Sequence, residues 1–566
     1  MAVAAAPTTD AAVRPMTAEE RKVIIASSAG TVFEWYDFYL AGSLAANISQ
    51  NFVPGTNETA KFIFVLFGFA AGFAVRPFGA LVFGRLGDLI GRKYTFLVTM
   101  TIMGIATFAV GLLPGYETIG YAAPVIFIIC RLAQGLALGG EYGGAATYVA
   151  EHSPHGRRGF YTSWIQTTAT VGLFLSLIVI LTLRLSMSPE DFARFGWRIP
   201  FLVSIVLLGF SIWIRLQLNE SPAFKKMKEE GTASKAPLKE AFGRWDNAKI
   251  ALIALLGGTA GQAVVWYTGQ FYALFFLTQT LKLDGTTANL CIALSLLIGT
   301  PFFVFFGWLS DKIGRKWILL FGCLIAAATY FPIFGQIAKV GNPKLIEATN
   351  NVKVTLTADP ATCGSLFDPV GVRTFTSPCD VIRRTLATAS VHYDLAAGPA
   401  GSPLKATVNG TDVSIPDTDK TGASVLAAAQ TAGYPKPGDP SILKTPSFGT
   451  VLTDSRGLQM IGLLTILIIF VTMVYGPIAA LLVELFPTRI RYTGMSLPYH
   501  IGNGWFGGFL PPTAFAIVAA SGNIFSGLWY PIIVALGTFV IGLIFLPETK
   551  DRDIFKYDGD GPSGRA

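Results

Sequence analysis

Two acidic side chains, Glu34 and Asp37, stand near the middle of an apolar run, residues 23–48, that is long enough to cross a lipid bilayer as one helix. An ionised carboxylate at that depth costs several kcal/mol, so it normally faces the interior of a helix bundle or a water-filled cavity. The three-residue spacing puts both acids on one face of the helix. We therefore expect the chain to be organised around these acids and the arginines that neutralise them.

Three more ionisable residues stand inside apolar runs, namely Arg76, Arg131 and Glu141. Arg76 needs an anion, which is either a protein carboxylate such as Glu34 or Glu141 or a bound carboxylate held bidentately. Glu141 is either a second proton-binding group or a structural acid. Glu34 either shares a proton with Asp37 or fixes helix contacts through hydrogen bonds.

The composition excludes an ordinary soluble protein. Of the 566 residues, 52% are hydrophobic and 14% are charged, against roughly 25% charged in a soluble domain, and the mean hydropathy is +0.52. The net charge of +8 does not indicate a nucleic-acid partner, because the basic residues form short clusters between apolar runs, as helix orientation in a membrane requires. We expect an all-α integral membrane protein in contact with the lipid bilayer.

Apolar segments long enough to span a membrane begin near residues 23, 60, 94, 122, 160, 198, 249, 286, 317, 457, 492 and 526, which predicts twelve crossings. Every second connection is basic, so the positive-inside rule places both termini in the cytoplasm. Residues 1–20 contain no short apolar stretch typical of a cleaved signal peptide.

The sequence also repeats itself. Gly84-Arg-Leu-Gly-Asp-Leu-Ile-Gly-Arg-Lys93 matches Gly307-Trp-Leu-Ser-Asp-Lys-Ile-Gly-Arg-Lys316, 223 residues later, and Glu151-His-Ser-Pro154 matches Glu484-Leu-Phe-Pro487, 333 residues later. The second offset is larger by 110 residues, which is about the length of the polar segment 339–456. The pattern therefore predicts two six-helix halves related as parallel repeats, with one insertion in the second half.

The insertion follows the ninth predicted crossing, so we expect it outside the cytoplasm, as a small folded cap or a partly disordered segment. Cys363 and Cys379 could be oxidised there. A disulfide closing this loop would stabilise the insertion by roughly 3 kcal/mol in the loop-entropy model; two reduced thiols are the alternative.

These observations divide the chain into predicted regions. They are a cytoplasmic tail (1–22), a first six-helix half (23–217), a cytoplasmic linker (218–248), a second half (249–338 and 457–547), the insertion (339–456) and a second cytoplasmic tail (548–566).

The repeated Gly-x-x-x-Asp-x-x-Gly-Arg-Lys loops resemble the characteristic cytoplasmic loop of the major facilitator superfamily, and Arg131-Leu-Ala-Gln134-Gly resembles its fourth-helix motif. More narrowly, several stretches resemble the metabolite:proton symporter family, which includes α-ketoglutarate, citrate, shikimate and proline/betaine carriers. These stretches are Glu34-Trp-Tyr-Asp-Phe38, Arg76-Pro-Phe-Gly79, Gly139-Gly-Glu-Tyr-Gly-Gly144, Trp197-Arg-Ile-Pro-Phe201, Glu220-Ser-Pro-Ala-Phe224 and Glu484-Leu-Phe-Pro-Thr-Arg489.

The resemblance implies roles for particular residues. A first-helix acid in a Tyr-Asp context pairs with the fourth-helix arginine in proton-coupled sugar porters, so Asp37 is expected to pair with Arg131 and to take a proton when the arginine moves away. A permanent structural salt bridge is the alternative. We expect Asp37, Glu34 and Glu141 to couple transport to protons.

Candidate substrate-binding residues combine the two arginines with amides and aromatic side chains of the first, fourth, seventh and eleventh predicted crossings. They are Arg76, Arg131, Gln134, Tyr36, Trp266, Tyr267, Gln270, Tyr499 and Asn503. Ordinary helix packing is the alternative for each aromatic residue.

The repeated loops are expected to cap helix ends and hold one conformation closed. Their residues are Gly84, Asp88, Gly91, Arg92, Asp311, Gly314 and Arg315.

The first functional hypothesis is a monomeric secondary transporter, not an enzyme, that imports a small carboxylate-bearing metabolite with a proton. The second is a carrier of a zwitterion such as proline or betaine. The third is a membrane sensor whose insertion binds a ligand without transport. We expect no metal and no cofactor apart from the coupling proton, because no metal-ligand cluster or nucleophile–base pair stands out.

Overall fold

The computed structural model describes residues 17–52, 71–217, 219–367, 376–416, 419 and 421–554. The first group of helices, here the N-terminal helix group, comprises α1 (Ala18–Ser43), α2 (Ala45–Phe52), α4 (Arg76–Ile90), α5 (Arg92–Leu112), α6 (Tyr116–Ile119), α7 (Ala122–His152), α8 (Arg158–Ser186), α9 (Pro189–Arg194), η1 (Gly196–Arg198) and α10 (Ile199–Leu216). Two short helices follow, α11 (Pro222–Glu229) and α12 (Pro237–Gly243).

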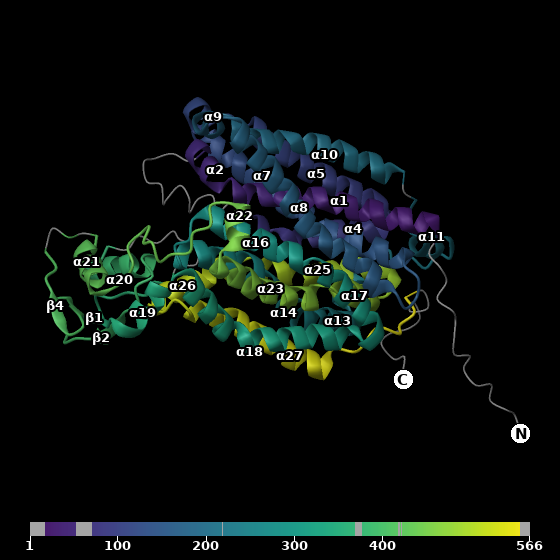
Figure 1. Ribbon diagram of the computed structural model, residues 1–566. Coiled ribbons are helices and arrows are strands. Elements are labelled where there is room, and N and C mark those ends of the chain that lie inside the picture. The colour runs from purple at the N-terminus through teal and green to yellow at the C-terminus, as the bar shows by residue number, and fades with distance from the viewer. Residues whose placement is uncertain are drawn as a thin grey trace, which may run out of the picture.

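The second group, here the C-terminal helix group, begins with one long helix that π-helical turns divide into α13 (Trp245–Ala254), η2 (Leu255–Thr259), α14 (Ala260–Tyr267), η3 (Thr268–Tyr272), α15 (Ala273–Phe275) and η4 (Phe276–Thr280). It continues with α16 (Gly285–Gly299), α17 (Pro301–Ile313), α18 (Arg315–Gly341), α23 (Ser455–Tyr475), α24 (Ile478–Leu485), η5 (Thr488–Ile490), α25 (Arg491–Ile501), η6 (Gly502–Gly507), α26 (Leu510–Ser521), η7 (Ser526–Leu528) and α27 (Trp529–Phe545). Figure 1 shows the two groups side by side, with α5, α7 and α10 in the first and α18, α23 and α27 in the second.

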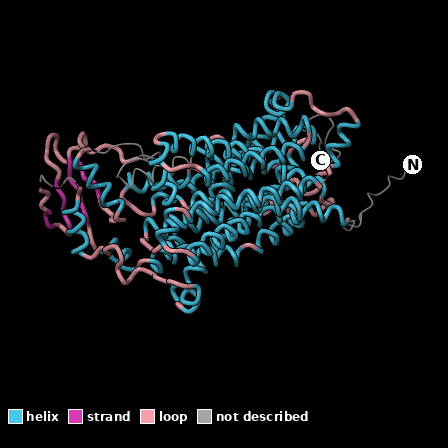
Figure 2. The backbone as a smooth tube through the Cα atoms, turned by 90° about the horizontal axis from the view of Figure 1, so that it is seen from above, coloured by secondary structure: helices cyan, strands magenta, loops and turns pink. Residues whose placement is uncertain are grey.

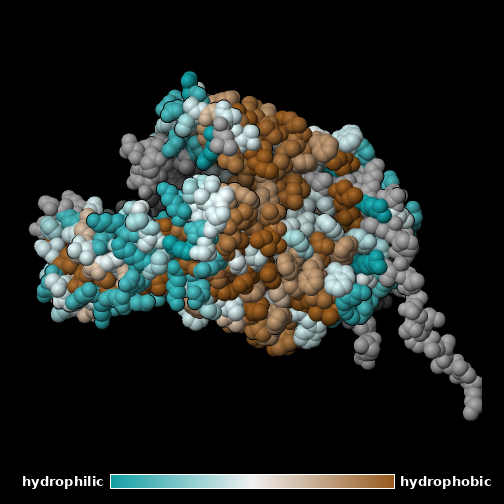
Figure 3. Space-filling view, viewed as in Figure 1, coloured by the Kyte–Doolittle hydropathy of each residue, from teal (hydrophilic) through white to brown (hydrophobic). Residues whose placement is uncertain are grey.

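Nine helices among the described residues are long and apolar enough to span a membrane. The predicted spans that begin near residues 23, 60 and 492 are not among the nine. α1 carries the two acids, residues 53–70 lie outside the described part of the chain, and η6 interrupts the helix that begins at Arg491. On the face shown in Figure 3, hydrophobic surface covers the middle of the helix bundle, with hydrophilic surface towards both ends.

The two helix groups pack most extensively near the end of the bundle that carries α11 and α12, here called the basic end. α4 of the first group lies on α25 of the second, and α8 of the first lies on α17 of the second. Glycines allow this approach, because a Cβ atom on Gly307 would lie 2.6 Å from the carbonyl oxygen of Gly159. The two groups are therefore closed against each other at the basic end.

The described elements from α19 (Pro343–Asn351) to α21 (Ala423–Ala432) form a separate α/β unit beyond the other end of the bundle, where the described strands gather (Figure 2). Its helices are α19, α20 (Pro378–Thr388) and α21, and its strands are β1 (Val354–Ala358), β2 (Asp394–Ala397), β3 (Lys405–Val408) and β4 (Thr411–Val413). The next helix, α22 (Phe448–Thr453), packs on α16 and α23 of the C-terminal helix group. The sheet order is β2-β1-β3-β4, with β1 parallel to β2 (Thr355 opposite Asp394) and antiparallel to β3 (Val354 opposite Val408).

This sheet corrects the all-α prediction. The strand signal was present, because Val354, Leu356 and Ala358 alternate with polar residues and point into the core of the unit. The β3–β4 turn also has a recognisable sequence, since Asn409 and Gly410 both adopt positive φ angles of 51° and 81°, as a two-residue hairpin turn requires.

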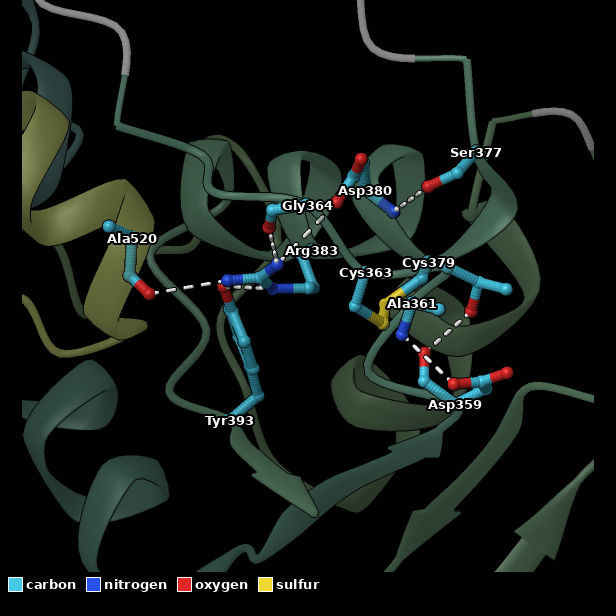
Figure 4. The surroundings of a disulfide bond; sticks show 11 residues. Asp359, Ala361, Cys363, Gly364, Ser377, Cys379, Asp380, Arg383, Tyr393 and Ala520 are labelled. Carbon is cyan, nitrogen blue, oxygen red and sulfur yellow. Dashed lines mark hydrogen bonds and ion pairs between the residues drawn. A yellow bond between two sulfur atoms is a disulfide. The ribbon is translucent and has the colours of Figure 1, made fainter. Parts of the chain in front are cut away.

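The α/β unit is attached to the C-terminal helix group. Arg383 donates to the carbonyl oxygens of Gly364 (2.7 Å) and Ala520 (3.3 Å), so one side chain ties the unit to the end of α26 (Figure 4). Tyr393 donates to Ala519 (3.1 Å), and Ser390 donates to Thr280 (2.8 Å) at the end of the long helix.

Cys363 and Cys379 form the disulfide that the sequence suggests, with 5.4 Å between their Cα atoms (Figure 4). It joins the chain after β1 to the first turn of α20. The bridge lies next to Arg383 on the same helix, so it fixes the helix that anchors the unit.

Replacing both cysteines (Cys363→Ser with Cys379→Ser) should destabilise the α/β unit by about 3 kcal/mol. The disulfide closes a loop between cysteines 16 residues apart, and without it the unfolded chain regains the conformational entropy that this loop removes. Hydrogen exchange of α20 and β1 measures the effect. A reductant should reproduce it in the natural protein and add nothing in the double variant; equal protection with and without the bridge would contradict the prediction.

Candidate functional site

Arg76 and Arg131 line the same pocket, which lies between helices of the N-terminal group. Phe38, Phe73 and Gln134 also line it. The Arg76 guanidinium carbon lies 4.3 Å from the centre of the Phe73 ring, and each arginine has an Nε atom without a hydrogen-bond partner. Throughout the described residues, no carboxylate oxygen lies within 4 Å of either guanidinium.

The expected ion pair between Asp37 and Arg131 is not formed in this conformation. Asp37 is buried and interacts electrostatically with Arg131 and with the hydroxyl of Thr107, but one of its oxygens has no hydrogen-bond partner. The Thr107 hydroxyl also positions Gln134, whose amide nitrogen donates a hydrogen bond to it (2.7 Å). Asp37 therefore lies close enough to Arg131 to influence it without neutralising it by direct contact.

Glu34 and Glu141, the two carboxylates considered as protein partners for Arg76, instead contact another arginine. Arg215, in the last turn of α10, lies 3.3 Å from Glu34 on α1 and 3.7 Å from Glu141 on α7. Its guanidinium fits because Gly30 lacks a side chain, and a Cβ atom there would lie 2.1 Å from Arg215 Nη2. Nothing in the sequence alone singles out Arg215, because it stands at the end of an apolar run, where arginines usually reach the membrane surface.

Aromatic residues of the C-terminal helix group face the N-terminal group across the centre of the molecule. The Arg76 guanidinium interacts electrostatically with Tyr267 and Tyr499. Tyr499 stacks on Tyr142 of α7, with 3.7 Å between the ring centres, and Tyr39 donates to Gln270 (3.2 Å). These contacts place two of the predicted aromatic residues, Tyr267 and Tyr499, near Arg76.

Three of the predicted substrate-binding residues have other surroundings. Tyr36 donates to the carbonyl oxygen of Pro200 (2.8 Å) and packs against α10, away from the pocket. Asn503 exchanges two amide hydrogen bonds with Gln262, of 3.0 and 3.2 Å. The indole nitrogen of Trp266 has no partner, and its ring lies 5.6 Å from that of Trp35.

A buried charge network connects the two helix groups at the basic end. Asp88, at the end of α4, accepts a hydrogen bond from the backbone nitrogen of Thr493 (2.9 Å) in the first turn of α25. Arg92 lies 3.4 Å from Glu151, and Glu151 lies 2.7 Å from Arg491 on α25. An acid and an arginine of the first group therefore hold a helix of the second.

A second network repeats this arrangement with the roles of the groups exchanged. Asp311, at the end of α17, accepts hydrogen bonds from Gly159 (2.9 Å) and Phe160 (2.8 Å) in the first turn of α8. Arg315 lies 3.1 Å from Glu484, which lies 3.6 Å from Arg158 on α8. The internal repeat found in the sequence thus produces two equivalent locks at one end of the molecule.

Glycines shape both locks. Gly91 and Gly314 precede α5 and α18 with φ angles of 123° and 114°, a region that favours glycine. A Cβ atom at either position would also lie 2.3 Å from a carboxylate oxygen, of Glu220 and Glu548 respectively. These two acids accept hydrogen bonds from the first backbone nitrogens of the helices, Arg92 (3.2 Å) and Arg315 (2.9 Å).

A protein-family model described as "Sugar (and other) transporter" matches residues 22–358 and 443–560. The described helices and strands between these ranges all belong to the α/β unit.

Several known proteins are similar to this chain, among them two relatives and one solved structure. The α-ketoglutarate permease of Escherichia coli (strain K12) is 36% identical over 323 residues, which cover 56% of this chain and 72% of that protein. The proline/betaine transporter of Salmonella typhimurium is 34% identical over 327 residues, which cover 56% of this chain and 64% of that protein. The proton:xylose symporter XylE of E. coli, bound to 6-bromo-6-deoxy-D-glucose, shares the fold alone, with a TM-score of 0.60, 15% identity, and coverage of 95% of this chain and 98% of that chain.

Removing the charge from either lock should open the basic end. We expect Asp88→Asn and Asp311→Asn each to weaken the closed arrangement by roughly 1–2 kcal/mol, because each loses a charge at a helix N-terminus. Spin labels at the exposed positions Arg85 and Lys312 should then report longer distances between the two helix groups.

The control is Glu230→Gln, which breaks an exposed pair with Lys226 and should leave the distances unchanged. Spin-label distances that stay as short as in the natural protein in both Asp variants would contradict the role of Asp88 and Asp311 in holding the basic end closed.

Proposed function

This chain belongs to the sugar (and other) transporter family, part of the major facilitator superfamily, and on that premise we propose that it is a proton-coupled symporter that imports a small carboxylate-bearing metabolite by alternating access. The family membership makes it a multi-pass membrane transporter. The proton, the carboxylate and the direction of transport are the proposal.

The observation that carries the proposal is the pocket shared by Arg76 and Arg131. Both guanidiniums are about nine-tenths buried or more, and neither has a carboxylate within 4 Å among the described residues. A buried charge without a counter-ion is costly. A substrate carboxylate would supply the missing anion, and an arginine can bind it through two parallel hydrogen bonds.

The proposal includes a membrane arrangement. We take the chain to cross a bacterial inner membrane twelve times as two six-helix halves, with the α/β unit inserted between the ninth and tenth crossings. The basic end faces the cytoplasm by the positive-inside rule, so both termini lie there and the α/β unit lies outside. The conformation described above is then closed towards the cytoplasm.

The two locks and the pocket support a route for import. Substrate reaches Arg76 and Arg131 from the side of the α/β unit while the locks hold α25 and α8 in place. Opening the locks would let the two halves rotate and expose the pocket to the cytoplasm. Because the α/β unit is bonded to the C-terminal group through Arg383 and Tyr393, it would move with that half.

Coupling requires a group that binds a proton in step with the substrate. Asp37 interacts with Arg131, which also lines the substrate pocket. A substrate anion that draws the Arg131 guanidinium towards itself would leave Asp37 without its cation, and the acid would then take up a proton. Glu34 and Glu141 are further candidate coupling groups.

A zwitterionic substrate such as proline or betaine is the second candidate, and a specific feature favours it. Phe38 and Phe73 line the pocket beside the arginines, and Tyr267 of the other helix group packs against Phe73. Aromatic faces attract quaternary ammonium groups. One relative, moreover, is a proline/betaine transporter.

Replacing the pocket arginines should weaken anion transport. We expect Arg76→Lys and Arg131→Lys each to raise the KM for the transported acid about tenfold or more, because the loss of a charge-assisted bidentate contact costs roughly 1.5–3 kcal/mol. Initial uptake rates into vesicles measure this. The exposed Arg194 on α9 provides the control, since Arg194→Lys should change nothing; an unchanged KM in both pocket variants would contradict the binding role.

Uptake by energised cells tests the substrate class and the coupling together. Unlabelled dicarboxylates, aromatic acids and betaines should compete unequally, with the carboxylic acids strongest. Collapse of the proton gradient should abolish accumulation against a concentration gradient. Accumulation that survives the collapse would contradict proton-coupled symport. Competition by betaine alone would show that the substrate is a zwitterion rather than a metabolite acid.

A further inference from the structure

Glu34, Glu141 and Arg215 form a closed cluster of two acids and one base. Arg215 lies 3.3 Å from Glu34 and 3.7 Å from Glu141, and the exposed fractions of the three residues are 5%, 0% and 2% for Glu34, Glu141 and Arg215. The two carboxyl groups also interact directly with each other. Neither oxygen of Glu141 accepts a hydrogen bond from a described protein donor.

The charges of this cluster do not balance if both acids are ionised. One guanidinium neutralises one carboxylate, and no other Lys or Arg among the described residues lies within 4 Å of either acid. The surroundings offer little compensation, because the Phe96 ring covers Arg215 at 3.3 Å from its centre. A single proton shared between Glu34 and Glu141 would make the cluster neutral and give Glu141 a hydrogen bond.

The neighbouring titratable groups leave this balance unchanged. Asp37 lies one turn further along α1 and interacts electrostatically with Arg131, without direct contact between the two groups. Tyr492 approaches from α25, where its hydroxyl donates to the carbonyl oxygen of Gly140, and it interacts with both acids as a neutral phenol. The excess negative charge therefore belongs to the glutamate pair.

We propose that Glu34 and Glu141 share one proton beside Arg215, and that this pair holds a proton that is transported with the substrate. The second clause rests on the proposed symport. Arg215 is then a positioning residue, because it holds the two carboxyl groups together and neutralises whichever one is ionised.

The contact between α25 and α7 explains how the proton would be kept until the basic end opens. Ser496 and Tyr492 of α25 lie against Gly143 and Gly144, one turn beyond Glu141. When the locks open, α25 leaves this face of α7 and the Tyr492–Gly140 contact breaks. The pair then becomes accessible to the cytoplasm, and the carboxylic acid releases its proton as a hydrogen ion.

Infrared spectroscopy of the purified full-length protein tests the shared proton without any substrate. A protonated buried carboxyl gives a C=O stretching band that shifts on exchange into D₂O. We expect the natural protein at neutral pH to show a band that both Glu34→Gln and Glu141→Gln remove, because the remaining acid ionises beside Arg215. The matched variant Asp37→Asn should retain it.

A band that persists in both glutamine variants, or that disappears in Asp37→Asn, would overturn the proposal. Arg215→Met provides a second readout, since the band should grow when both acids lose their cation.

Reconstituted vesicles test the second clause. Two rates are compared in the Glu141→Gln variant, namely accumulation of substrate driven by the proton gradient and exchange of substrate without a gradient. The ratio of accumulation to exchange should fall to the background level. An unchanged ratio would contradict the claim that the glutamate pair holds a transported proton. If the natural protein ignores the proton gradient while the infrared band behaves as expected, symport fails and the shared proton stands. If the band is unaffected while accumulation still needs the gradient, symport stands and the shared proton fails.

Discussion

A charge inside the membrane-spanning region must meet an opposite charge, and this requirement organises the molecule. Arg215 meets Glu34 and Glu141, and the acids of the basic end meet Arg92, Arg315 and their partners. Arg76 and Arg131 are the pair left without a carboxylate within 4 Å among the described residues. The exception identifies the place where a ligand would complete the charge balance, so binding and folding obey the same electrostatic rule.

The two locks show how a repeated sequence produces a symmetric constraint. Asp88 caps a helix of the C-terminal group and Asp311 caps a helix of the N-terminal group. Each lock therefore crosses the boundary between the groups, and neither group could be closed by its own residues alone. Because both act at the same end, their joint release would open that end while the far end is free to close, as rigid-body alternating access requires.

The α/β unit adds a folded body that, among the described residues, is hydrogen-bonded to the C-terminal helix group. Its hydrogen bonds through Arg383, Tyr393 and Ser390 all reach the C-terminal group. It is a hairpin-containing sheet with a disulfide, which suits a compartment outside the cytoplasm. A body that is fixed to one half can move with it, which explains how so large a unit is compatible with the transporter fold.

The sequence by itself determined the helical membrane architecture, the internal repeat with its interruption, and the burial of the acids in α1, because hydrophobic length, basic clusters and charges within apolar runs follow from residue order alone. It also indicated that Asp88 and Asp311 are equivalent. Only the tertiary structure decided which charges meet. Arg215 is 181 residues from Glu34, and no local pattern distinguishes it from an arginine at the membrane surface. The Glu34–Glu141–Arg215 cluster, the unpaired Arg76 and Arg131, and the sheet pairing of the α/β unit all depend on contacts between segments distant in the chain, where three-dimensional packing selects the partner.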